Sequence, residues 1–110
     1  MADQQQLALL REDVIAWNQW RQEHPNRKPD LTGADLSSAN LTQASLDGAD
    51  LSCTDLTGAN LINTHLEHFN FNGADLRGAN LKGATNITIE KLEKQVKLLK
   101  GATMPDGSIQ

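Results

Sequence analysis

A five-residue repeat runs without insertion from Pro29 to Gly83 and constrains this chain more than any other feature. Eleven consecutive units carry a leucine, or once a phenylalanine, at the same central position, and nine have a small residue two positions earlier. A fixed period of this kind decides the architecture before local propensities do. The central residues, which we predict form the core, are Leu31, Leu36, Leu41, Leu46, Leu51, Leu56, Leu61, Leu66, Phe71, Leu76 and Leu81.

A step of five fits neither regular secondary structure. On an α-helix, residues five apart are rotated by about 140°, so the leucines would cover every face. On a flat strand, residues five apart point to opposite faces. The pattern is satisfied if each unit is a short extended segment followed by a turn, so that the small residue and the leucine both point inward. The repeat therefore predicts a coil with a continuous apolar centre, in which each turn packs only against its neighbours.

The repeated unit, A(D/N)LXX, resembles that of the pentapeptide repeat proteins, and this resemblance covers half the chain. It implies an all-β solenoid, a right-handed quadrilateral β-helix in which four units form one coil. Eleven units then make about three coils, and the tower is about 13 Å tall before its caps. The first helix, with its two tryptophans, resembles that of small cyanobacterial members, for which no activity is assigned.

The flanking segments predict an α-helix at each end of the tower. We expect residues 1–28 to form an N-terminal capping helix and connector, 29–86 the β-helix, and 87–110 a C-terminal capping helix plus one repeat-like turn. Apolar residues at helical spacing indicate a first helix from Gln4 to Glu23 that covers the open first coil, with Trp17 near Leu31 and Leu36. The alternative is that this amphipathic helix binds a partner.

The second helix is predicted from Thr88 to Lys100, with Thr88 as N-cap and Gly101 as its stop. Beyond it, Ala102 takes the small position and Met104 the centre of one more unit. The buried stripe of this helix is predicted at Leu92, Val96 and Leu99.

Four coil faces follow if residues twenty apart stack. The position before each centre then forms ladders of aspartates, of asparagines and of mixed residues. Asparagines are expected to hydrogen-bond along their stack, whereas stacked aspartates repel unless solvent or backbone amides relieve them. The predicted ladders are Asp30–Asp50–Asn70, Asp35–Asp55–Asp75, Asn40–Asn60–Asn80 and Ser45–His65–Thr85.

The unit around His65 breaks the repeat. Phe69 occupies a small-residue slot, where it must either widen the core or bulge the coil. The departures define a candidate partner patch, and the alternative is a drifted unit with a compensated core. The residues of this patch are Ile62, His65, Glu67 and His68.

No set of residues predicts catalysis, a cofactor or a metal. By the unit count, Cys53 lies at a different corner from His65 and His68, too far to share zinc. Gly78 and Gly83 have the spacing of a phosphate loop, but alanine stands at the lysine position. No serine has an evident base beside it. We expect a protein that is not an enzyme.

Charge and composition argue against nucleic acid and membrane as partners. The net charge is −4, and residues 29–83 carry seven acidic against two basic residues, which repel phosphate. No apolar run approaches the length of a membrane span. A single cysteine and an N-terminus without a signal region predict a cytoplasmic protein.

The sequence therefore predicts a rigid protein-interaction module, a monomer or weak homodimer, with a protein partner of unknown identity. The alternative comes from the resemblance: some pentapeptide repeat proteins look like B-form DNA and bind DNA gyrase. The short tower and modest charge of this chain weaken that alternative. In a DNA mimic of this kind, the carboxylates that take the place of the DNA phosphates would be those of Asp30, Asp35, Asp50, Asp55 and Asp75.

Overall fold

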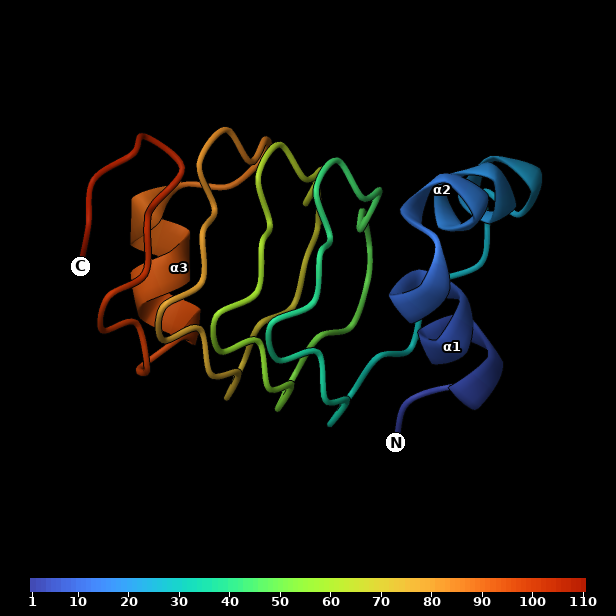
Figure 1. Ribbon diagram of the computed structural model, residues 1–110, viewed down its shortest axis with the longest axis horizontal. Helices are drawn as coiled ribbons and strands as arrows, with labels where there is room; N and C mark the ends of the chain where they lie inside the picture. The colour runs from blue at the N-terminus through green and yellow to red at the C-terminus, as the bar shows by residue number, and fades with distance from the viewer.

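The computed structural model describes residues 1–110 and measures 35 × 24 × 21 Å. It contains three helices: α1 (Gln4–Glu12), α2 (Val14–Glu23) and α3 (Ile89–Gln95). A stack of coils separates α1 and α2 at one end from α3 and the C-terminal segment at the other (Figure 1).

The coils are joined by isolated parallel bridges between residues twenty apart, which is four repeat units per turn. These bridges follow the predicted ladders, for example Asp30 with Asp50 and Asn40 with Asn60. The coils form a repeat solenoid, as expected, but the bridges are single-residue and form no continuous strand. Each unit turns directly after its bridge, so the ladder never reaches a second residue.

The turn in each unit uses the left-handed backbone region. The second residue after each centre has a positive φ, which glycine adopts freely and other residues adopt at a cost of about 1–2 kcal/mol. Five units have a residue other than glycine at this position and still adopt the same turn. The distribution of glycine in the sequence therefore understates how uniform the turns are. These residues are Ser38, Gln43, Cys53, Asn63 and His68.

Every central leucine and Phe71 is at most 1% exposed, and they form one apolar cluster along the coil axis. Two units have threonine in the small slot, and each hydroxyl donates to the carbonyl of the preceding centre, Thr54 to Leu51 (2.7 Å) and Thr64 to Leu61 (2.8 Å). Phe69 is 8% exposed and packs against Phe71 with ring centroids 5.0 Å apart. Its N–H lacks the bond to the preceding centre's carbonyl that the small-slot residues of the other units make, so the turn opens to admit the ring.

The N-terminal region is two helices rather than the single helix predicted from Gln4 to Glu23. Asp13 interrupts it with extended backbone (φ −157°, ψ 105°), and its carboxylate accepts from the N–H groups of Ile15 and Ala16. Aspartate favours this N-cap role over a helix interior. The break separates the two contact regions, since Gln6 of α1 accepts from the Asp30 N–H (2.9 Å) while α2 lies over Ser45.

Helix α3 ends earlier than predicted. The Thr88 hydroxyl accepts from the Lys91 N–H as an N-cap, but the backbone is already extended at Val96. The chain then rejoins the coil, where Leu98 bridges Asp75 and Thr103 bridges Asn80. Leu99, expected on the helix, therefore lies beyond it, because the open edge of the last coil takes its carbonyl partners from residues 98–105.

Candidate functional site

The Ser45–His65–Thr85 ladder differs from the other three because it has no aspartate or asparagine. His65 is exposed, and its Nδ1 lies 3.2 Å from the Thr85 hydroxyl. Ser45 is held by α2, where Asn18 accepts from its N–H (2.8 Å) and Trp17 Nε1 donates to its carbonyl (2.9 Å). The buried Trp17 thus lies over this ladder.

Glu67 and His68 form the corner that follows His65. Because His65 cannot accept as an aspartate would, the Glu67 N–H donates instead to Asp47 Oδ1 in the coil before (2.6 Å). Glu67 Oε1 lies 3.6 Å from His68 Nε2, and the His68 side chain is 86% exposed. Both side chains are presented to solvent on a backbone fixed by the coil.

Ile62 lies one corner earlier and is half-buried, with its N–H donating to Asn60 Oδ1 (3.0 Å). The structure therefore brings Glu67 and His68 into contact, places His65 beside Thr85, and leaves Ile62 outside these contacts. The predicted patch spans two successive corners rather than one cluster.

A pocket of about 390 Å³ adjoins this patch and was missed by sequence reasoning. We call it the α3 notch, because one wall is the coil and the other is α3. Lysines three residues apart on a helix share a face, which was the available signal, but the register between helix and coil was not predictable. The residues that line it are His68, Phe69, Asn72, Lys91, Lys94 and Gln95.

The acidic ladders lie on other faces and are stabilised within their own units. The Asp35 carboxylate accepts from the Ser37 N–H (3.1 Å) and hydroxyl (2.6 Å), and asparagines such as Asn40 accept in the same way from Thr42. The expected bonding along asparagine stacks is therefore wrong for Asn40, since its side-chain oxygen is used by local turns. These local bonds supply the relief from repulsion that the stacked aspartates need.

The same hydrogen bonds hold several aspartates in their charged form. Donation by Thr32 lowers the pKa of Asp30, and donation by Ser37 lowers the pKa of Asp35. Arg77 lowers the pKa of Asp75 through a hydrogen bond and an ion pair of 2.6 Å. The ladder is thus charged, but Arg77 partly neutralises it and Leu98 ends it.

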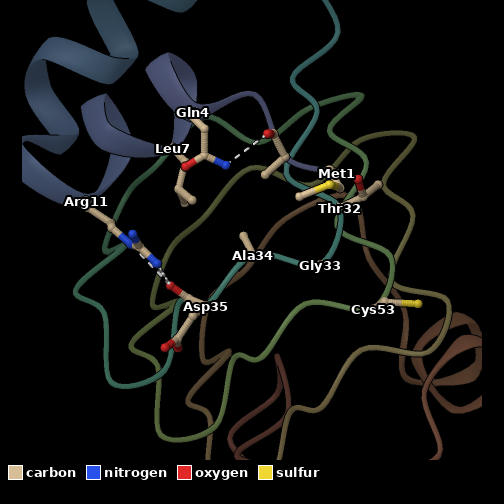
Figure 2. A pocket seen from close by; sticks show the side chains of 10 residues that line it. Met1, Gln4, Leu7, Arg11, Thr32, Gly33, Ala34, Asp35 and Cys53 are labelled. Carbon is tan, nitrogen blue, oxygen red and sulfur yellow. Dashed lines mark hydrogen bonds between the residues drawn. The ribbon is translucent and has the colours of Figure 1, made fainter.

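A second pocket, of about 460 Å³, lies where α1 meets the first coil (Figure 2). Figure 2 shows Arg11 reaching from α1 to the Asp35 carbonyl, with Cys53 at the opposite side of the pocket. Its lining mixes apolar, polar and charged groups without convergence on one point.

No three histidine, cysteine or acidic side chains gather anywhere in the chain to hold a metal. None of the three helices has the length and apolar character of a membrane span.

Coils of four five-residue units around a leucine core define a solenoid repeat protein. The family model for pentapeptide repeats matches residues 30–67 and 54–85 with eight copies, and the chain belongs to this family. Pentapeptide repeat proteins are typically non-enzymatic structural modules, and their structures imply a right-handed quadrilateral β-helix.

Solved structures of the family resemble the chain. A pentapeptide repeat protein from the Arabidopsis thaliana thylakoid lumen is 30% identical, with a TM-score of 0.60, over 73% of this chain and 55% of that one. HetL, involved in heterocyst differentiation regulation in the cyanobacterium Nostoc sp. strain PCC 7120, is 32% identical, with a TM-score of 0.49, over 92% and 46%. Rfr23 from the cyanobacterium Cyanothece 51142 is 45% identical, with a TM-score of 0.32, over 50% and 41%.

The chain spans about half the length of these solved structures. A search of curated proteins finds no match.

Proposed function

We propose that this protein is a rigid, non-enzymatic protein-interaction module that docks a partner through the patch of Ile62, His65, Glu67 and His68. One observation carries the proposal: the unit that departs most from the repeat presents its departing polar side chains to solvent while its backbone stays tied to the coil before. A surface ordered in advance lowers the entropy that binding must overcome.

The proposal includes the finer architecture that the family implies. The coil is a right-handed quadrilateral β-helix of about three coils, and the helices at its ends act as caps. Support comes from the side chains of Gln6 and Gln95, which accept from the Asp30 and Phe71 N–H groups at opposite ends of the stack. We propose a cytoplasmic monomer or weak homodimer, without direct nucleic acid or membrane contact; the thylakoid-lumen relative supplies the alternative location.

Affinity capture with matched variants tests the docking patch. We expect Glu67→Lys combined with His68→Ala to release a protein that the wild-type chain retains at moderate salt. The control is the triple variant Asp35→Asn, Asp55→Asn and Asp75→Asn, which should retain the same protein. The docking patch would be refuted by a partner that the triple aspartate variant loses and that the variant with Glu67→Lys and His68→Ala still retains.

The acidic ladder supports the alternative that the protein mimics DNA and binds DNA gyrase. The observation in its favour is that Asp35, Asp55 and Asp75 stack in one ladder and that the pKa of Asp35 and of Asp75 is lowered. In a supercoiling assay with purified gyrase, a mimic inhibits at low salt and loses this effect as salt rises. The triple aspartate variant should abolish inhibition; an undiminished effect would exclude the ladder as its source.

A further inference from the structure

The α3 notch has a charge opposite to that of its surroundings. Two lysines and a histidine line it, and none of its six lining residues is acidic. Glu90 and Glu93 lie on the same helix but do not line it. The repeat region around it carries seven acidic residues against two basic ones. Such a basic hollow in an acidic surface favours a short acidic segment that fits the hollow over a long polyanion that would also cross the acidic faces.

The coil wall of the notch also offers a free backbone donor. At the equivalent position one coil earlier, the Gly48 N–H donates to the Glu67 carbonyl (2.7 Å). The His68 N–H makes no hydrogen bond, because the chain leaves the coil after Thr85 and forms α3 instead of the next turn. The φ of His68 (+56°) is close to that of Gly48 (+70°), so His68 keeps the left-handed turn conformation in which the Gly48 N–H donates to the next coil.

Contacts between α3 and the coil set the width of the notch. Gln95 Oε1 accepts from the Phe71 N–H (2.7 Å), which ties the end of α3 to the coil. Leu92 is fully buried beneath the helix, and Phe69 is packed against Phe71. The hollow therefore exists before any ligand arrives, which favours binding.

We propose that the α3 notch binds an acidic peptide segment of a partner protein. Lys91 and Lys94 pair with its carboxylates, and the His68 N–H donates to a carboxylate oxygen, a charge-assisted bond of the kind that is stronger than a neutral one. Phe69 supplies an apolar wall beside the acid. The inference rests on the proposed interaction role, since His68 belongs to both the patch and the notch.

The test is an NMR titration of the full chain with a hexaglutamate peptide, followed through the backbone amide signals. We expect saturable shifts centred on His68, Phe69 and Asn72. Lys91→Glu with Lys94→Glu should weaken binding by about tenfold or more. The matched control is Lys97→Glu with Lys100→Glu, which changes the net charge equally outside the notch and should leave affinity within about twofold.

Two outcomes overturn the proposal: no saturable shift at these amides, or equal weakening by both lysine pairs, which would reveal general charge attraction. All four lysines are exposed, so we expect both double variants to fold. Amide spectra that match the wild-type spectrum away from the substituted residues would show this. A hexaserine peptide is the uncharged control and should not shift the signals. The two experiments fail independently because the titration uses a peptide of known sequence. If the peptide does not bind, a partner can still be captured through the Glu67 side of the patch. If no partner is captured, the titration still tests the notch.

Discussion

Leu56→Ala tests the core of the coil most directly. Leu56 is 0% exposed and stacks between Leu36 and Leu76, which are 1% and 0% exposed. Both walls of the resulting hole are bound through backbone hydrogen bonds to the coil, so they relax little. Leucine-to-alanine changes in cores cost about 2–5 kcal/mol, more where the site cannot collapse. We therefore expect a loss of about 3–5 kcal/mol, a large part of the roughly 5–15 kcal/mol that stabilises a typical domain.

Urea unfolding followed by circular dichroism measures this loss. With a slope of about 1–3 kcal/mol per molar urea, a loss of about 3–5 kcal/mol should lower the midpoint by roughly 1–5 M. The matched control is Leu98→Ala, since Leu98 is 43% exposed and occupies an outward ladder position. It should cost less than about 1 kcal/mol. A loss below about 1 kcal/mol for Leu56→Ala, or equal losses for both variants, would refute the inward assignment.

His68→Gly should stabilise the protein by up to about 1 kcal/mol, because it relieves a positive φ in a non-glycine residue; a loss on urea unfolding would contradict this. Gln95→Ala should cost about 1–3 kcal/mol, since it orphans the Phe71 N–H, whereas Gln22→Ala at an exposed site should be nearly neutral. Stability should also fall as the pH drops below about 4, because aspartates with lowered folded-state pKa values take up protons more readily when unfolded; pH-independent urea midpoints would argue against it. Those aspartates are Asp30, Asp35, Asp75 and Asp106.

The five-residue period predicts a coil with the leucines inside, but it does not say how many units complete one turn. The stacking of residues twenty apart was predicted from the resemblance to pentapeptide repeat proteins, which implies four units per coil. The same logic predicted that Asp35 lies beside Asp55 and His65 beside Thr85. It did not predict the turn conformation at His68, since the pattern shows glycine there in only some units.

The ends of the helices were harder to predict than the coil, because the spacing of their apolar residues fits more than one structure. Leu10 and Val14 continue one periodic pattern across Asp13, and only the capping bonds of that aspartate reveal the break. At the other end, Leu99 fits both a helical stripe and a coil centre. The coil position prevails because the N–H groups at the open edge, those of Leu76 and Gly78, donate to the carbonyls of residues 98 and 100. The α3 notch depends on this competition, so the sequence pattern could not place Lys91 and Lys94 beside His68.

The distinctive chemistry of the chain is concentrated where the turn bonds of the repeat are missing. In the other ladders, an aspartate or asparagine closes each turn with its own side chain, which leaves little freedom for substitution. The Ser45–His65–Thr85 ladder lacks that constraint, and α2 supplies bonds to Ser45 while Asp47 supplies one to Glu67. Because α2 and Asp47 hold this backbone, the side chains of His65, Glu67 and His68 do not have to close their own turn. Within this chain, the ladder with the least uniform residues is therefore the one that carries the proposed docking patch.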